Sequence, residues 1–228
     1  MILKKMIGAM GAHYGFAFEY LFSHKPENHT LRVLDIGAAS NPWGGSWITH
    51  IADNFITPET EQQFSNKGIT VFKVDVEDSL NWSLVLDDVE KNGKFDFVIC
   101  SHTLEDLNNP KIALQMINKI GKAGYISMPS KYAEFTKFET RGGLEGYNGY
   151  HHHRWIYQIK SDVLFGYPKM NFLEYAKLEE GEVNTTVEIA FMWEDSFDYK
   201  LLAPHQLLHN TVGENLLYQL LEKDDLVI

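Results

Sequence analysis

The chain has 228 residues, of which 44% are hydrophobic and 13% aromatic, and its formal net charge is −11. This hydrophobic content supports a packed core and excludes a disordered chain. The negative charge argues against nucleic acid and against an anionic membrane surface as partners, because both attract basic protein faces. A small molecule is therefore the expected partner.

Cysteine content and apolar runs indicate the compartment. Cys100 is the only cysteine, so no disulfide framework exists and a reducing cytoplasm is expected, with Cys100 as a buried apolar residue. The apolar segment from Met6 to Phe18 is interrupted by His13 and Tyr14, and no small-residue cleavage site precedes Asp35. No uninterrupted apolar run reaches the roughly 20 residues that a membrane span needs.

Hydrophobic spacing predicts the elements in chain order. Helices are expected over 4–22, 58–66, 79–91, 110–120 and 213–222, and strands over 31–36, 46–52, 69–74, 95–100 and 125–128. Shorter strands are expected over 155–159, 163–165, 186–193 and 199–202. For the second strand a helix with Trp47, Ile48 and Ile51 on its apolar side is the alternative, but Gly44 and Gly45 disfavour it.

The alternation of strand and helix, repeated five times, predicts the fold class. It indicates βαβ units, and hence a parallel sheet with right-handed crossovers between two helical layers. Beyond Pro129 only short strands and turns follow, without a repeat or a second domain boundary. We expect a three-layer α/β Rossmann-like fold whose C-terminal strands extend the same sheet in the antiparallel direction.

Three carboxylates follow or end successive predicted strands. They are Asp35, Asp53 and Asp75, and Asp53 lies near the offset at which dinucleotide-binding folds place an acid on ribose hydroxyls. Since ligands of parallel sheets bind beyond the carboxyl ends of the strands, these acids predict a site for an adenosine-containing ligand there. The small residues after Gly37 would let such a ligand approach the backbone.

The turn after the first strand bears on which adenosine ligand binds. It reads Gly37-Ala38-Ala39-Ser40-Asn41-Pro42 and lacks the second and third glycines of a dinucleotide turn. Pro42 has no N–H to offer a pyrophosphate. These departures disfavour a nicotinamide-dependent oxidoreductase and favour a ligand without phosphates, such as a sulfonium nucleoside.

The chain resembles the Rossmann-like S-adenosylmethionine-dependent methyltransferases over residues 30–130. The resemblance rests on Val33-Leu34-Asp35-Ile36-Gly37, Asp75-Val76-Glu77-Asp78, the run from Phe95 to Leu107, and Pro129-Ser130. It implies one methyltransferase-like domain over 1–228, with the cofactor core at 30–130 and a substrate-side extension at 131–228.

The resemblance also implies roles for individual residues. Gly37, Ala38 and Ala39, after Asp35, would back the methionine and ribose parts of S-adenosylmethionine, Asp53 would hold the ribose hydroxyls, Asp75 and Val76 would meet the adenine, and Ser101 and His102 would face the methionine end and the acceptor. Ala39 replaces a glycine that is usual in the family. Asp106 stands where a histidine often follows Leu-Glu.

The run His151-His152-His153-Arg154-Trp155 resembles that of a subgroup with His-His-Arg-Trp after the Pro-Ser loop. On a strand His151 and His153 would share one face. We expect a general base among His152, His153 and His102, because the pKa of histidine lies near neutrality. A structural role for the run remains an alternative. A metal site is not expected, because adjacent histidines rarely converge and no carboxylate stands at ligand spacing.

The segment before this run carries several glycines and two tyrosines. The loop over 139–150 is either a lid over the site or a surface connection. Tyr150 and His151 are expected to contact the acceptor, and Arg154 to bind a carboxylate or phosphate on it.

These observations predict a function. We expect an S-adenosylmethionine-dependent methyltransferase that methylates an oxygen or nitrogen of a small polar acceptor. The alternative is a non-catalytic S-adenosylmethionine or nucleotide-binding module of the same fold. The sequence predicts neither the acceptor nor the oligomeric state.

Overall fold

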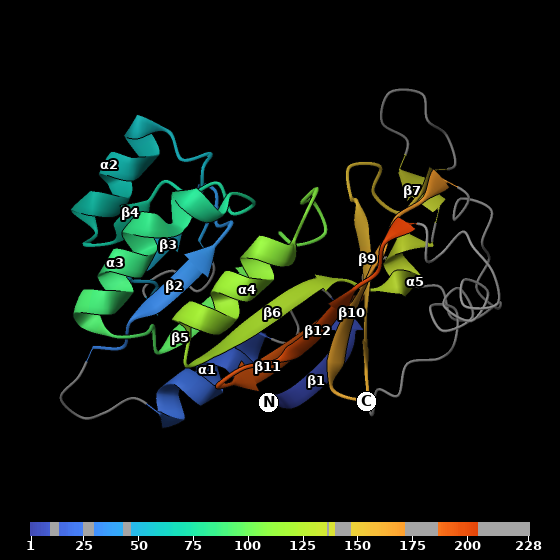
Figure 1. Cartoon of the computed structure of the whole chain (residues 1–228), viewed down its shortest axis with the longest axis horizontal. Coiled ribbons are helices and arrows are strands. Elements are labelled where there is room, and N and C mark those ends of the chain that lie inside the picture. The colour runs from blue at the N-terminus through green and yellow to red at the C-terminus, as the bar shows by residue number, and fades with distance from the viewer. Residues whose placement is uncertain are drawn as a thin grey trace.

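The structure is a computed structural model that describes residues 1–9, 14–24, 30–42, 47–135, 137–139, 147–171 and 187–204. It contains a seven-stranded sheet with helices on both faces, and a three-stranded sheet beside it (Figure 1). This architecture confirms the expected three-layer α/β Rossmann-like fold.

The large sheet is mostly parallel. Its spatial order is β1 (Ile2–Ala9), β11 (Val187–Glu194), β6 (Ala123–Pro129), β5 (Phe97–Ser101), β2 (Val33–Ile36), β3 (His50–Ala52) and β4 (Thr70–Phe72). The five strands from β6 to β4 are parallel, and β11 lies antiparallel between β6 and β1. The antiparallel C-terminal strand is thus confirmed as an inserted neighbour of β6.

Alternating strand residues build a core on each face of the sheet, as the period of two requires. The helices are α1 (Tyr14–Ser23), α2 (Pro58–Asn66), α3 (Ser83–Asn92), α4 (Lys111–Ile120) and the short α5 (Lys131–Glu134), with a 3₁₀ turn η2 (Ser79–Trp82) before α3. Val33 and Phe97 share one core with α1 and α2. Leu34 and Val98 share the other core with α3 and α4. Within the described residues no helix is both long and apolar enough to cross a membrane.

Local sequence signals place α2 correctly. Thr57 caps the helix by accepting a hydrogen bond from the Thr60 N–H at 3.2 Å, and Pro58 occupies the first helical turn. Gly68 follows the helix with a φ of +74°. The predicted helix over 58–66 is therefore confirmed at both ends.

The single helix predicted over 4–22 is wrong in its first half. Residues 2–9 form strand β1, which pairs antiparallel with β11 from Ile2 opposite Trp193 to Ala9 opposite Val187. Ile2 and Met6 are buried. Pairing with a distant strand outweighs the helical spacing of the local sequence, because most of the stabilisation of an element comes from its tertiary contacts.

The second half of the chain also departs from the expectation. Only β11 joins the large sheet, whereas β9 (Trp155–Lys160), β10 (Val163–Pro168) and β12 (Asp198–Leu201) form the separate three-stranded sheet. Two further strands, β7 (Lys137–Glu139) and β8 (Tyr147–Asn148), pair with each other. The strand predicted over 46–52 is confirmed at 50–52 in place of the alternative helix. The middle of the loop over 139–150 and the helix predicted over 213–222 lie outside the described residues.

Candidate active site

A cavity of about 390 Å³ lies beyond the carboxyl ends of β2, β3, β4 and β5. Six of the residues predicted to bind the cofactor line it: Gly37, Ala39, Asp53, Asp75, Val76 and His102. Three others are placed elsewhere. Asp35 is buried inside β2, Ala38 packs against the core under α1 and α2, and Ser101 shares a 2.8 Å hydrogen bond with Ser127.

The chain turns sharply into this cavity after strand β2. Gly37 has a φ of +74°, and a Cβ there would overlap the side chain of Thr103. Ala39 also has a positive φ, of +46°. Its N–H donates to Asp53 Oδ2 at 2.8 Å, so the turn after β2 is tied to the end of β3.

The two acids of neighbouring strands are held by backbone groups. Asp53 is 5% exposed, and its Oδ1 accepts a second hydrogen bond from the Phe55 N–H at 2.6 Å. Asp75 Oδ1 accepts a hydrogen bond from the Glu77 N–H at 3.0 Å. These bonds fix both carboxylates at the cavity wall, and each oxygen keeps a further lone pair for a ligand.

The charge of the cavity wall suits a particular kind of ligand. Four carboxylates line it, those of Asp53, Asp75, Glu77 and Asp106, whereas none of the described lining residues is a lysine or arginine. Such a wall disfavours phosphates and favours a cation that carries hydroxyl groups. S-adenosylmethionine carries a sulfonium, an amine and a ribose diol, and these groups suit a wall of carboxylates that attract positive charge and accept hydrogen bonds.

His102 lies between two buried glutamates. Its Nε2 is 2.9 Å from Glu188 Oε2 of β11, and its Nδ1 is 3.3 Å from Glu105 Oε1. Burial lowers the pKa of His102, but the hydrogen bonds and negative charges of Glu105 and Glu188 outweigh burial and raise the pKa to about 9. His102 is therefore an imidazolium at neutral pH, with a left-handed backbone φ of +50°.

The histidine run lies in a turn before β9 rather than on a strand. The Arg154 N–H donates to Glu105 O at 2.6 Å, which brings the turn against the loop after β5. The Nε2 atoms of His152 and His153 each lie 3.8 Å from Asp106 Oδ1. The alternation of faces expected for a strand is thus wrong, and the two adjacent histidines converge.

His153 is the buried member of this group. Its Nδ1 lies 2.5 Å from Glu134 Oε1, and Glu134 Oε2 accepts a hydrogen bond from Lys169 Nζ at 2.7 Å. Tyr150 packs on the His153 ring with the ring centroids 4.6 Å apart. His151 and Arg154 are exposed next to this group.

Several residues of the site escape sequence reasoning. Glu134 and Glu188 belong to distant elements, and nothing in the local sequence marks them as partners of His153 and His102. Asp106 and Glu105 stand in the Leu-Glu-Asp triplet after the fourth predicted strand, so the triplet itself was the available signal.

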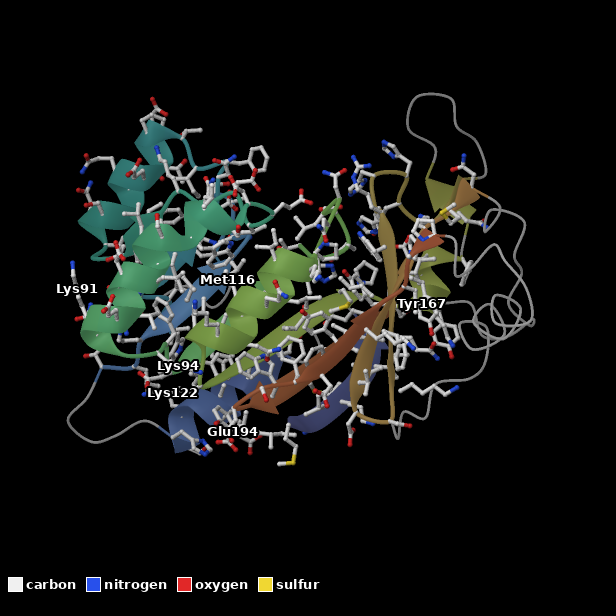
Figure 2. The ribbon with its side chains drawn as sticks, viewed as in Figure 1. Lys91, Lys94, Met116, Lys122, Tyr167 and Glu194 are labelled. Carbon is white, nitrogen blue, oxygen red and sulfur yellow. The ribbon has the colours of Figure 1, made fainter. Side chains whose placement is uncertain are left out.

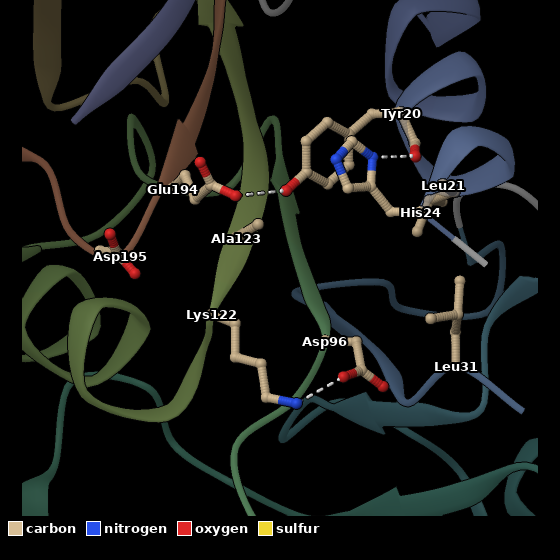
Figure 3. Close-up of a pocket in the computed structure, with 9 residues that line it drawn as sticks. All are labelled: Tyr20, Leu21, His24, Leu31, Asp96, Lys122, Ala123, Glu194 and Asp195. Carbon is tan, nitrogen blue, oxygen red and sulfur yellow. Dashed lines mark hydrogen bonds and ion pairs between the residues drawn. The ribbon is translucent and has the colours of Figure 1, made fainter. Parts of the chain in front are cut away.

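A second cavity, of about 340 Å³, lies at the amino ends of the parallel strands β2, β5 and β6 (Figure 3). There the Tyr20 hydroxyl donates to Glu194 Oε1 at 3.1 Å, and Lys122 Nζ pairs with Asp96 Oδ1 at 2.7 Å. Lys94 and Lys122 are labelled near each other in the view of Figure 2, and Lys122 lines this cavity. None of the residues predicted to bind the cofactor lines this second cavity, so the cavity beyond the carboxyl ends of the parallel strands is the candidate site.

Comparison with known proteins identifies the family. The family model described as "Methyltransferase domain" matches residues 4–164. No curated protein matches the sequence significantly.

Solved structures give distant likenesses. An S-adenosylmethionine-dependent methyltransferase from Mesorhizobium loti is 14% identical, with a TM-score of 0.36 over 57% of this chain and 59% of its own. The plantazolicin methyltransferase BpumL in complex with SAH is 15% identical, with a TM-score of 0.44 over 81% of this chain and 82% of its own. The N-terminal domain of EvdMO1 with SAH bound is 13% identical, with a TM-score of 0.39 over 82% of each chain. The chain thus spans less than two thirds of the first of these proteins.

The subgroup with the His-His-Arg-Trp run is not tested by any of these comparisons and stays a prediction. The family model, however, covers well over half of the 228 residues. The chain therefore belongs to the methyltransferase domain family.

Proposed function

We propose that the chain transfers the methyl group of S-adenosylmethionine to an oxygen or nitrogen of a small polar acceptor. The observation that carries this proposal is the position of Asp106, which lines the carboxylate-rich cavity and also lies 3.8 Å from His152 and His153. Asp106 thus connects the cavity assigned to the methyl donor with the two histidines assigned to the acceptor.

The donor's nucleoside is assigned to the acids of the cavity. Asp53 accepts hydrogen bonds from the ribose hydroxyls, because two carboxylate oxygens match a vicinal diol. Asp75 and Val76 contact the adenine, and the turn formed by Gly37, Ala38 and Ala39 supports the methionine and ribose parts. When bound, S-adenosylmethionine supplies an electrophilic methyl group on its sulfonium.

His102 is assigned to the donor and not to proton removal. With a pKa of about 9 it already carries a proton at neutral pH, so it is a poor general base. Both of its ring nitrogens are held by Glu105 and Glu188, so its role at the donor is to position the loop after β5 at the cavity wall. Ser101 precedes it at the end of β5 and supports its position.

The acceptor is assigned to the turn before β9. Tyr150, His151 and Arg154 lie in or next to this turn and are assigned to contact with the acceptor, whose proton is assigned to His152 or His153. Transfer itself depends on alignment of nucleophile, methyl carbon and sulfur, so the main contribution of the protein is orientation. The net charge of −11 and the single buried cysteine support a small-molecule acceptor in the cytoplasm.

A thermal-shift experiment tests the donor assignment. A ligand at about 100 times its Kd adds roughly 2.7 kcal/mol of stability, or a Tm shift of about 5–10 °C for a chain of this size. We expect the shift with S-adenosylmethionine and S-adenosylhomocysteine, and none with NAD or ATP. A shift with NAD alone would contradict the assignment.

Asp53→Asn is the matching variant. It keeps one acceptor oxygen but loses the charge, so the affinity for S-adenosylhomocysteine should fall about 10- to 100-fold in calorimetry, the range for a hydrogen bond to a charged group. Asp78→Asn is the control, because Asp78 also accepts a backbone hydrogen bond, from the Leu80 N–H at 2.9 Å, but does not line the cavity. Equal affinities of the two variants would remove Asp53 from the donor site.

The acceptor class requires turnover. Purified protein with methyl-labelled donor is offered alcohols, phenols, amines and carboxylic acids, and label in the acceptor is measured. Donor binding without transfer to any class would instead favour the binding module.

A further inference from the structure

Three side chains that meet at Asp106, a residue of the donor-cavity wall, have the arrangement of an incomplete metal site. Asp106 Oδ1, His152 Nε2 and His153 Nε2 all lie within 4.8 Å of one another. They come from two segments, the loop after β5 and the turn before β9, so the fold and not local sequence brings them together. We infer that they bind a divalent first-row transition-metal ion, with its remaining coordination positions open to the acceptor.

The ligand atoms are slightly too far apart to coordinate one ion, and a small movement of the side chains would bring them to coordination distance. Ligands about 2.0–2.2 Å from a metal ion lie roughly 3–3.5 Å from one another, whereas each histidine Nε2 is now 3.8 Å from Asp106 Oδ1. The side chains of His152 and Asp106 are 49% and 46% exposed. The side chains of His152 and Asp106 can therefore move toward an ion without disturbing the core.

His153 provides the fixed point of the site. Its Nδ1 is held by Glu134 at 2.5 Å, which leaves Nε2 directed at Asp106. A carboxylate on the far nitrogen of a histidine is the usual outer partner of a metal-binding imidazole, since it fixes the tautomer and raises the basicity of the ligand. Lys169 and the buried position of Glu134 hold this partner in turn.

The charge around the site favours a cation. Glu105 precedes Asp106 and is 1% exposed, and its Oε2 accepts no hydrogen bond from any described residue. Oε1 of the same carboxylate faces His102, but that imidazole is shared with Glu188, so a positive ion beside Asp106 would stabilise the remaining negative charge. The pair of imidazoles selects zinc and similar ions over magnesium, which prefers oxygen ligands.

The site deepens the proposed function and its catalytic role rests on that function. Asp106 also lines the donor cavity, so an ion there lies beside the acceptor. A bound ion would lower the pKa of an acceptor hydroxyl coordinated to it, as it lowers that of a bound water, and the hydroxyl proton would pass to solvent. The oxygen lone pair then forms the bond to the methyl carbon, and the carbon–sulfur bond breaks with its electrons kept by sulfur. The products are the methylated acceptor and S-adenosylhomocysteine, without any oxidant or reductant. The histidine nitrogens act here as ligands, and the ion replaces them as the cause of deprotonation.

Metal binding is measured directly on the full chain. Protein stripped with a chelator is titrated with Zn²⁺ and with Mg²⁺ by calorimetry, and with Co²⁺ by its visible absorption. We expect one Zn²⁺ per chain, weaker binding of Mg²⁺, and a Co²⁺ spectrum with nitrogen ligands. Absence of Zn²⁺ and Co²⁺ binding by the folded protein would overturn the inference.

Variants assign the ligands. His152→Ala and Asp106→Asn change half-exposed side chains, and each should weaken Zn²⁺ binding more than about 10-fold. Glu134→Gln should weaken it by about 10- to 100-fold, as for other outer partners. His151→Ala is the matched control for metal affinity, because His151 is exposed and adjacent but not one of the converging ligands. Equal Zn²⁺ affinity of all four variants and the original protein would overturn the site.

Donor binding is measured on the same samples. A thermal shift with S-adenosylhomocysteine that persists in stripped protein separates the donor site from the ion. If the original protein binds Zn²⁺ but does not bind S-adenosylhomocysteine, the proposed function is contradicted and the metal site is still supported. Methyl transfer that is unchanged by the chelator, in protein that binds no ion, would overturn the catalytic role of the ion.

Discussion

Ala39 carries backbone strain at the donor turn. Its φ of +46° lies in the left-handed region, where a side chain costs about 1–2 kcal/mol. The hydrogen bond from its N–H to Asp53 holds this conformation and links the strain to the residue assigned to the ribose. An alanine in place of the usual family glycine is therefore expected to lower stability at this turn.

Ala39→Gly should stabilise the protein. Removal of the strain outweighs the greater chain entropy of glycine, which costs roughly 0.5–1 kcal/mol, so we expect a gain of about 0.5–1 kcal/mol in the free energy of unfolding, measured by urea denaturation.

Gly37→Ala is the opposite test at the same turn. Its φ is +74° and its new Cβ would overlap Thr103, so it should destabilise by at least about 1–3 kcal/mol. A destabilised Ala39→Gly together with a neutral Gly37→Ala would contradict this description of the turn.

At single positions the sequence predicted which residues line the cavity better than it predicted which residues converge on Asp106. Gly37, Asp53, Asp75 and His102 follow or lie near strand ends, which local patterns reveal. The convergence of His152 with Asp106 depends instead on how the turn before β9 packs on the loop after β5. No periodicity within either segment encodes that contact.

At the level of elements, a glycine in β6 controls how two strands pack. A Cβ on Gly124 would overlap the Val98 carbonyl and the ring of Trp193, a fully buried residue of β11. The absence of a side chain lets the indole lie across β6 and close the core between β11 and α4.

Gly124→Ala should therefore cost about 1–3 kcal/mol of stability, because the added methyl group overpacks a filled core. Thermal and urea denaturation measure the loss. Gly15→Ala is the control: Gly15 lies in α1, nothing stands within 4 Å of its Cβ, and alanine favours helix by about 0.5–1 kcal/mol. Equal destabilisation by the two changes would refute the packing argument.

Elements with local signals were predicted well, and elements defined by distant partners were not. Helix α2 has its own cap and stop, and β5 is a continuous apolar run. Strand β1 has neither, and its residues carry spacing that also suits a helix. Its conformation depends on β11, which is nearly the whole described chain away. The same reason explains why β9, β10 and β12 were not expected as a separate sheet.

Over the whole molecule, His102 clamps two distant parts through charge. It connects the loop after β5, by Glu105, to β11, by Glu188, and both glutamates are almost completely buried. Because its folded pKa of about 9 exceeds the ordinary value of 6.5, the folded state binds the proton more tightly than the unfolded state. The stabilisation is complete below pH 6.5 and is lost as the pH rises through about 9.

The free energy of unfolding should accordingly fall by up to about 3 kcal/mol between pH 6.5 and pH 9.5. Urea denaturation at several pH values measures the decline. Glu188→Gln keeps a hydrogen-bond partner but removes one charge, which lowers the folded-state pKa of His102, so the decline should be smaller and should end at a lower pH. Identical profiles for the original protein and this variant would show that the clamp does not act through charge.

The place of β1 at the edge of the large sheet also determines the order of folding. Among the described strands β1 pairs with β11 alone, so it cannot join the sheet until residues 187–194 are available. Closing so long a loop is slow, since distant contacts form only after the intervening chain has ordered. Until β11 has been made, the apolar side chains of β1 and the unpaired edge of the sheet are exposed to aggregation or to a chaperone.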